Sequence, residues 1–240
     1  MKIMTFNIQH CRNFISGEID FPLFAKAIST RGADICGLNE VRGKGPVRDY
    51  EDQTNTIGDM LGFNRYFGEA IKVRKSSPYG NALVSRFAFR SVETIKIPDP
   101  VFKFERTSYE SRCIIKAVVS VDETDICILV THMGLARSER KNAVRTICSI
   151  IDSTDMPVVL MGDFNAEPDD SVFDPIREKL SDTQDKSVNP EVMTYPSDKP
   201  SVKIDYIFYR GLQCVSAETI TDIYADHLPI IAEFNVCHKG

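Results

Sequence analysis

The chain has 240 residues, a size that suits one large domain or two small ones. Hydrophobic residues make up 42% and charged residues 26%, with 13 glycines and 12 prolines, which excludes disordered, collagen-like and disulfide-scaffold chains. The 29 Lys and Arg against 34 Asp and Glu give a net charge of -5, which disfavours a globally basic, non-specific nucleic-acid binder but leaves local basic patches open.

The first residues predict a strand rather than a secretion signal. They contain neither an apolar core of roughly 7–15 residues nor a small-residue cleavage site, and no run approaches the roughly 20 apolar residues of a membrane span. The seven cysteines are scattered without a C-x-x-C pair, and Cys36, Cys113 and Cys127 lie within apolar stretches. We interpret them as reduced thiols. With Met1 as the native start, these observations predict a cytoplasmic protein.

Short apolar, β-rich runs along the chain predict strands at residues 3–8, 35–38, 81–84, 89–97, 113–121, 126–131, 158–161, 204–209 and 229–234. Helical signals lie at residues 20–31, 50–61, 136–151 and 170–180. The remaining segments, 41–49, 72–79, 98–111 and 181–201, are expected to be loops. Many strands with few helices predict one domain over residues 1–240, with stacked sheets covered by helices.

Polar side chains suited to metal binding and acid–base chemistry follow the ends of the apolar strands. They are Asn7, Glu40, His132, Asp163 with Asn165, Asp205, and Asp226 with His227. A carboxylate at the end of a buried strand is costly unless a cation, a hydrogen-bond network or water compensates it. A converging set of oxygen and nitrogen ligands of this kind suits Mg²⁺, with Mn²⁺ as the alternative.

Two of these segments are the most informative. After the apolar strand at 158–161, Asp163 and Asn165 stand two residues apart and therefore face the same way, so that they could orient a water and accept its proton. The alternative is an ordinary turn. Asp226 precedes His227, and an acidic neighbour favours a charged imidazole, although a lone histidine is more often structural.

Seven short motifs, taken together, resemble the endonuclease/exonuclease/phosphatase superfamily, also called DNase I-like. They are Thr5-Phe6-Asn7-Ile8, Leu38-Asn39-Glu40-Val41, Tyr79-Gly80-Asn81-Ala82, Val130-Thr131-His132-Met133, Met161-Gly162-Asp163-Phe164-Asn165, Ile204-Asp205-Tyr206-Ile207 and Ala225-Asp226-His227-Leu228-Pro229. No single motif is decisive, but their joint order and spacing are specific. The resemblance implies a four-layer α/β/β/α sandwich of two packed mixed sheets, and Mg²⁺-dependent cleavage of phosphoester bonds as in small bacterial-type hydrolases.

The resemblance also implies a role for each matched residue. The metal ligands would be Glu40, with Asn7 and Asp226 beside it. The catalytic residues would be Asp163 for the attacking water, Asn165 and His132 for the phosphate, His227 for the transition state and Asp205 for orienting His227. A supporting Glu-x-Arg element matches Glu110 and Arg112.

The expected substrate-binding residues are Asn81, Arg112, Arg42 and Lys44, of which the last two lie in a basic segment that is otherwise a solvated surface loop. Gln9 stands where several nucleases of the family have an acidic residue, so one metal ligand is missing and the analogy to abasic-site endonucleases is weaker. A phosphodiester substrate is favoured; DNA or RNA, a lipid headgroup and a sugar or inositol phosphate stay open. No long apolar loop suggests membrane insertion, and a monomer is expected. A catalytically silent binding module is the non-enzymatic alternative.

Overall fold

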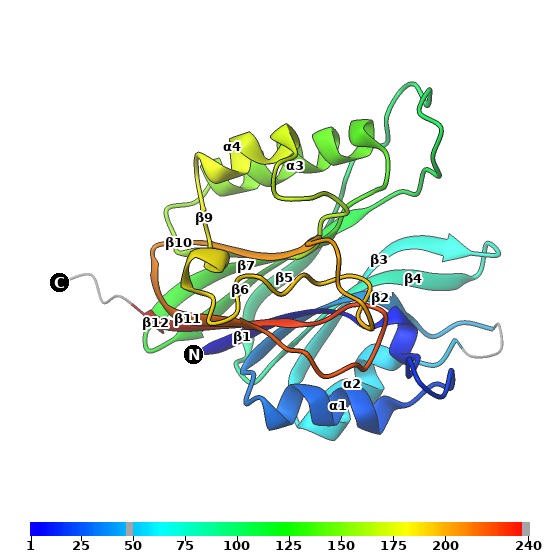
Figure 1. Ribbon diagram of the computed structural model, residues 1–240, viewed down its shortest axis with the longest axis horizontal. Coiled ribbons are helices and arrows are strands. Elements are labelled where there is room, and N and C mark those ends of the chain that lie inside the picture. Colours follow the sequence, from blue (N-terminus) through cyan, green and yellow to red (C-terminus); the bar gives the residue numbers. More distant parts are fainter. Residues whose placement is uncertain (47–49, 237–240) are drawn as a thin grey trace.

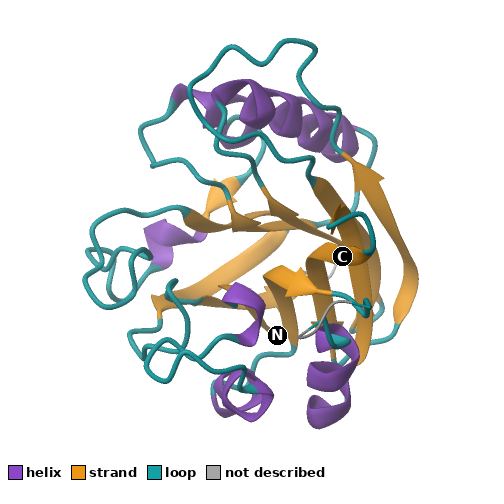
Figure 2. Cartoon of the chain, turned by 90° about the vertical axis from the view of Figure 1, so that its right-hand side faces the viewer, coloured by secondary structure: helices purple, strands orange, loops and turns teal. Residues whose placement is uncertain are grey.

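The computed structural model describes residues 1–46 and 50–236 of the chain. Two six-stranded sheets pack face to face, and helices cover both outer faces, so four layers are stacked (Figures 1 and 2). The four-layer sandwich expected from the sequence is therefore confirmed. Among the described residues, no helix is long and apolar enough to cross a membrane.

The first sheet contains both ends of the described chain. Its strands, in spatial order, are β11 (Leu212–Thr219), β12 (Ile230–Val236), β1 (Lys2–Asn7), β2 (Ile35–Arg42), β4 (Ser77–Ser85) and β3 (Asn64–Val73). β1 and β2 are parallel and are connected through α1 (Phe21–Thr30), whereas the other neighbours are antiparallel. Because β1 lies between β2 and β12, the first and last strands are held in one sheet.

The second sheet repeats this arrangement with a single parallel pair. Its strands, in spatial order, are β5 (Phe89–Lys96), β6 (Cys113–Val121), β7 (Thr124–His132), β8 (Val158–Asp163), β10 (Asp205–Arg210) and β9 (Ser181–Asp182). The parallel strands β7 and β8 are connected through α3 (Arg137–Asp152). The remaining helical segments are α2 (Gln53–Leu61), α4 (Asp174–Arg177) and the short turns η1 (Gln9–Cys11), η2 (Ser171–Phe173) and η3 (Thr183–Lys186).

Three apolar layers hold the sandwich together. The central layer, between the sheets, includes Leu83, Ile115 and Met161. The outer layers pack α1 and α2 against the first sheet and α3 and α4 against the second. Each fully buried aliphatic or aromatic side chain contributes about 1.5–3 kcal/mol. At Gly37 the sheets approach closely, because a Cβ there would lie 2.9 Å from the Met161 sulfur.

Several sequence-based boundaries were wrong. β3 and β11 were not expected as strands, and the loop expected at 72–79 is mostly the β3–β4 hairpin. Strand β2 continues to Arg42, into the loop expected at 41–49, of which residues 47–49 lie outside the described residues. The helix expected at 170–180 is only η2 followed by α4, and the loop expected at 181–201 contains β9 and η3. The six described cysteines are free thiols, as expected, and Cys237 lies outside the described residues.

Candidate active site

The sheet topology brings the polar strand ends to one place. Parallel pairing sets Asn7 opposite Asn39 at the ends of β1 and β2, and His132 opposite Asp163 at the ends of β7 and β8. Strand β10 begins antiparallel to β8, which sets Asp205 opposite Asp163. The carboxyl ends of β1 and β2 lie toward the right of Figure 1, the side that faces the viewer in Figure 2.

Asp163 lies at the centre of this cluster and is buried. Its Oδ2 accepts a hydrogen bond from Asn7 Nδ2 at 3.1 Å and lies 3.4 Å from His132 Nε2 and 3.7 Å from His227 Nε2. Its Oδ1 accepts the backbone N–H of Asn165 at 2.9 Å. Burial, together with the neighbouring Asp205 carboxylate, raises the pKa of Asp163 to about 7, against the opposing effect of His227. Its protonation therefore changes near neutral pH.

His227 is held by a carboxylate behind it. Asp205 Oδ2 lies 2.9 Å from His227 Nδ1, and both residues are buried. Burial is the largest influence and opposes the charge, but the carboxylates of Asp205, Asp163 and Asp226 together outweigh it and raise the pKa of His227 to about 10. His227 is therefore an imidazolium at neutral pH. Within the described residues, Asp163, Asp205 and His227 form the one His/Cys/Asp/Glu group of three whose ligand atoms lie within 4.8 Å of one another.

His132 has the opposite protonation state. Arg112 Nη1 lies 3.2 Å from His132 Nδ1, and Glu110 holds the same guanidinium nitrogen at 2.9 Å. Because a guanidinium only donates, His132 Nδ1 accepts from Arg112. Burial, followed by the positive charges of Arg112 and His227, holds the pKa of His132 well below its usual range. The site therefore combines a neutral and a charged imidazole around one carboxylate.

Glu40 reaches the site through a β-bulge in β2. The register shifts so that Leu38 pairs with Ala82 but Val41 pairs with Gly80, and Glu40 itself has a left-handed φ of +59°. A bulge of this kind redirects side chains at the end of a strand. Glu40 Oε1 then lies 3.3 Å from Asn7 Nδ2.

Asp226 completes the group of oxygen ligands. Its Oδ2 accepts a hydrogen bond from Gln9 Nε2 at 2.9 Å, while its Oδ1 is buried without a hydrogen-bond partner. Burial raises the pKa of Asp226, with Glu40 and Asp205 adding to the effect and His227 opposing it. An orphaned carboxylate oxygen, close enough to Glu40 for the two charges to interact, fits a divalent cation with oxygen ligands.

Two of the predicted residues that bear on the phosphate lie beside Asp163. Asn165 has a left-handed φ of +49°, and its Nδ2 lies 3.1 Å from His132 Nε2 and donates to the Met133 carbonyl at 2.9 Å. Arg112 is mostly buried and contacts the site through His132.

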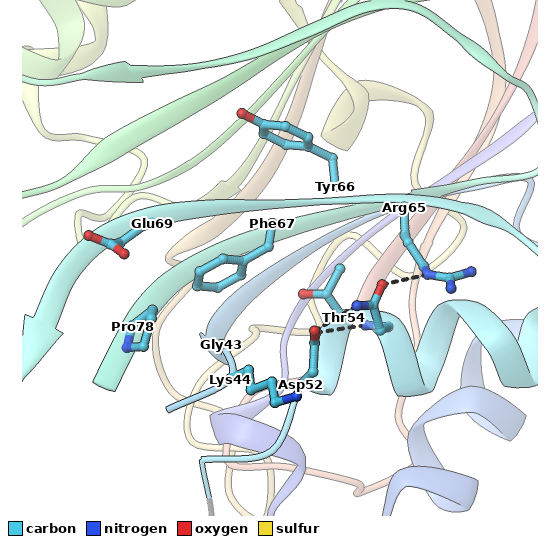
Figure 3. A pocket seen from close by; sticks show the side chains of 10 residues that line it. Gly43, Lys44, Asp52, Thr54, Arg65, Tyr66, Phe67, Glu69 and Pro78 are labelled. Atoms are coloured by element: carbon cyan, nitrogen blue, oxygen red, sulfur yellow. Dashed lines mark hydrogen bonds between the residues drawn. The ribbon is translucent and has the colours of Figure 1, made fainter. Parts of the chain in front are cut away.

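Two of the other expected substrate-binding residues, Asn81 and Lys44, lie outside this cluster. Asn81 is only 2% exposed, and its amide bonds Asn39 and the Cys113 carbonyl beneath the site. The guanidinium of Arg42 lies 5.1 Å from the Tyr50 ring centroid. Lys44 lies in a separate pocket of about 310 Å³ beside α2 and β3, whose lining includes none of the cluster residues (Figure 3).

Asn39 was part of the Glu40 motif but was given no role, and it connects the two sheets beneath the site. Its Nδ2 donates to Asn81 Oδ1 at 2.8 Å and to the Thr131 carbonyl at 2.9 Å, and its Oδ1 accepts the Asp163 N–H at 2.9 Å. It is fully buried, so all three bonds form away from water. The signal was a carboxamide inside an apolar strand, directly before Glu40.

The segment that precedes β10 also contributes to the site. The Thr194 hydroxyl accepts the N–H of Asp205 at 3.3 Å, and its carbonyl accepts the N–H of Leu228 at 2.8 Å. The Tyr195 ring lies 4.8 Å from the His227 ring. This segment therefore sets Asp205 and His227 relative to each other.

The β5–β6 connection is a loop, as expected for residues 98–111, but its exposed apolar side chains were not expected. Val101, Phe102 and Phe104 are 89%, 67% and 84% exposed. Glu105 anchors the loop by accepting the N–H groups of Arg137 and Ser138 at the start of α3, and the loop rises beside that helix in Figure 1.

Comparison with known proteins gives the class. Residues 4–227 match the Endonuclease/Exonuclease/phosphatase family, and the chain belongs to that family. Its fold is similar to an endonuclease/exonuclease/phosphatase from Beutenbergia cavernae (TM-score 0.81, 22% identity, 98% of this chain and 71% of that one). It is also similar to the Bacteroides thetaiotaomicron mannosyl-6-phosphatase (0.79, 16%, 98% and 99%) and the human Nocturnin catalytic domain with bound sulfate (0.71, 19%, 98% and 94%). Curated proteins give no sequence match.

Proposed function

We propose that this chain is a metal-dependent phosphoric ester hydrolase that acts preferentially on a phosphodiester. The observation that carries the proposal is the buried Asp163 carboxylate between a neutral His132 and a charged His227. Hydrolysis of a phosphoester needs a base for the attacking water and hydrogen-bond donors for the phosphoryl oxygens on which negative charge accumulates. This arrangement supplies both within one cluster.

Glu40, Asn7 and Asp226 would hold the cation, Mg²⁺ with Mn²⁺ as the alternative. When bound, it would offset the charge of the phosphoryl group and stabilise the leaving oxygen. The orphaned Oδ1 of Asp226 supports this assignment, because a buried carboxylate oxygen without a partner is otherwise costly.

The protein residues carry the remaining steps. Asp163, oriented by the Asn7 amide and the Asn165 N–H, aligns the attacking water and takes its proton. His227, kept charged by Asp205, donates to the phosphoryl oxygens as negative charge builds there, and the neutral His132, held by Arg112, would contact the phosphate.

Substrate contacts divide between direct and indirect roles. Asn165 and Arg112, beside His132, are suited to the phosphate itself. Asn81 acts through Asn39, since both are buried. Arg42 is the last residue of β2 and Lys44 follows it in the next loop, and both would contact only a larger substrate.

A phosphomonoester is the second candidate substrate. The observation that favours it is the mannosyl-6-phosphatase with a similar fold, which spans nearly the same length. Nuclease activity and a catalytically silent binding role are the remaining alternatives. The intact set of Glu40, Asp163 and His227 argues against a silent protein.

The test compares bis(p-nitrophenyl) phosphate with p-nitrophenyl phosphate in the presence of Mg²⁺ or Mn²⁺. Asp163→Asn and His227→Ala should each lower kcat/KM by about 10²–10⁴-fold. Asn235→Ala, in an exposed part of β12, is the control and should leave the rate unchanged. Equal rates in all four proteins would reject hydrolysis at this site.

A further inference from the structure

The turn η1 (Gln9–Cys11) is the most unusual backbone segment near the site. Gln9, His10 and Cys11 have φ values of +42°, +49° and +61°, so three consecutive non-glycine residues are left-handed. This region costs L-residues roughly 1–2 kcal/mol each, because the Cβ crowds a carbonyl oxygen. Such strain persists only where the surroundings enforce it, and it clusters at functional sites.

The surroundings of η1 do enforce it. The N–H of Gln9 donates to Asn7 Oδ1 at 3.2 Å, and Cys11 is buried in the core under the first sheet. The fully buried Gln53 of α2 donates to the His10 carbonyl at 2.7 Å and accepts the Arg42 N–H at 2.8 Å. The turn is therefore tied to β1 through Asn7 and, by way of Gln53, to β2 at Arg42, two residues after Glu40.

The conformation of η1 directs two neighbouring side chains to the two carboxylates of the proposed metal site. Gln9 Nε2 donates to Asp226 Oδ2 at 2.9 Å, and His10 Nδ1 lies 4.0 Å from Glu40 Oε2. The second distance is too long for a hydrogen bond. His10 Nδ1 is nevertheless shielded from solvent and has no hydrogen-bond partner.

A distance of 4.0 Å suits two ligands of one cation. With ligand bonds of about 2.0–2.2 Å, two donor atoms on one ion can lie up to about 4.4 Å apart.

We propose that His10 Nδ1 binds the divalent cation together with Glu40, and that this nitrogen ligand shifts the site toward Mn²⁺ relative to Mg²⁺. Imidazole suits first-row transition ions, whereas Mg²⁺ prefers oxygen ligands. The inference rests on the proposed function only in requiring a cation at Glu40. It does not require Asp226 as a ligand of the same ion, because His10, Glu40 and Asp226 are not a group of described residues whose ligand atoms lie within 4.8 Å of one another. It does not require that the bound cation supports hydrolysis.

The first test measures Mn²⁺ and Mg²⁺ binding to the EDTA-treated protein by isothermal titration calorimetry. His10→Ala should weaken Mn²⁺ binding by about tenfold or more and Mg²⁺ binding by less than about threefold. Gln9→Ala, a control in the same turn, should change both affinities by a similar factor. An equal loss of both ions in His10→Ala, or no loss, would overturn the proposal.

The second test detects the nitrogen directly, by electron spin echo envelope modulation of bound Mn²⁺. Imidazole ¹⁴N coupling should be present in the wild type and lost in His10→Ala; coupling that is absent from the wild type or persists in the variant contradicts the ligand role. His10→Gln, which keeps a polar side chain of similar size but has no imidazole, replaces the alanine variant if circular dichroism shows unfolding. Hydrolysis of the aryl diester by wild type without ¹⁴N coupling would reject His10 and leave the proposed function standing.

Discussion

At the scale of single residues, Asp163 and His227 set the expected pH dependence. The base must be ionised and the donor must be protonated. The pKa of Asp163 is raised to about 7 and that of His227 to about 10, so kcat/KM should fall as the pH decreases through about 7 and again as it increases through about 10. The measurement is the rate of aryl diester hydrolysis from pH 5 to 11 at saturating metal. A flat profile below pH 9 would rule out Asp163 as the base.

Asp205 should control the alkaline limb of that profile. Its carboxylate lies 2.9 Å from His227 Nδ1 and favours the imidazolium. In Asp205→Asn the pKa of His227 should therefore decrease, and the alkaline limb should move to lower pH. The acid limb should not move to higher pH. The same rate measurement on this variant, with Asn235→Ala as the control, checks the shift.

Asn39 should matter for stability as well as for rate. Replacing it by alanine leaves the Asp163 N–H, the Thr131 carbonyl and Asn81 Oδ1 buried without their partner, at about 1 kcal/mol or more each. Urea unfolding of Asn39→Ala should show a loss of about 2–4 kcal/mol. Asn235→Ala should stay within about 0.5 kcal/mol of the wild type.

At the scale of elements, Gly162 permits β8 to end beside β7. Its φ is +144°, and a Cβ there would collide with the Thr131 carbonyl oxygen of β7. Gly162→Ala should therefore cost more than about 3 kcal/mol and displace Asp163. Gly32→Ala is the matched control, because Gly32 is also left-handed (φ +67°) but has open space around it, and it should cost about 1 kcal/mol. Unfolding in urea distinguishes the two; equal losses would contradict the collision.

The strands and helices also show which parts of the fold can be predicted from the sequence. The strands with continuous apolar runs, such as β7 and β8, were found, because strands buried on both faces carry that signal. β3 and β11 were missed, because both are edge strands with polar residues on the exposed face. The helix at 170–180 was overestimated, since Pro175 lacks the N–H that would continue the turn from Ser171.

For the site, the polar residues at strand ends and the order of the motifs identified the residues around Asp163, but not the protonation states of all of them. In the sequence, Asp226 already favoured a charged His227. The neutral state of His132 depends on its burial and on Arg112, and the raised pKa of His227 depends also on Asp205 and Asp163. Those neighbours come from other strands and depend on the register. The left-handed turn at His10 had no local signal either, because no glycine marks it.

At the scale of the whole molecule, the topology predicts one cooperative unit. β12 pairs with β1 although they lie at opposite ends of the chain, and the central apolar layer joins the two sheets. Calorimetric unfolding should therefore give one transition whose calorimetric and van't Hoff enthalpies agree. Two resolved transitions would contradict the single domain over residues 1–240.

The net charge of -5 affects which substrates bind, a small phosphoester or a polyanion, rather than the reaction itself. Carboxylates of the site, among them Glu40, Asp163 and Asp226, contribute part of that charge, and a bound cation would offset it locally. Hydrolysis of a small aryl diester should therefore change less than about twofold between 50 and 200 mM NaCl. A polyanion held by many phosphate contacts would instead lose about 10³-fold or more in affinity over the same range.

Measuring KM for the diester and for single-stranded DNA across these salt concentrations separates the two. A steep loss confined to DNA, with efficient cleavage at low salt, would favour the nuclease alternative over a small phosphoester.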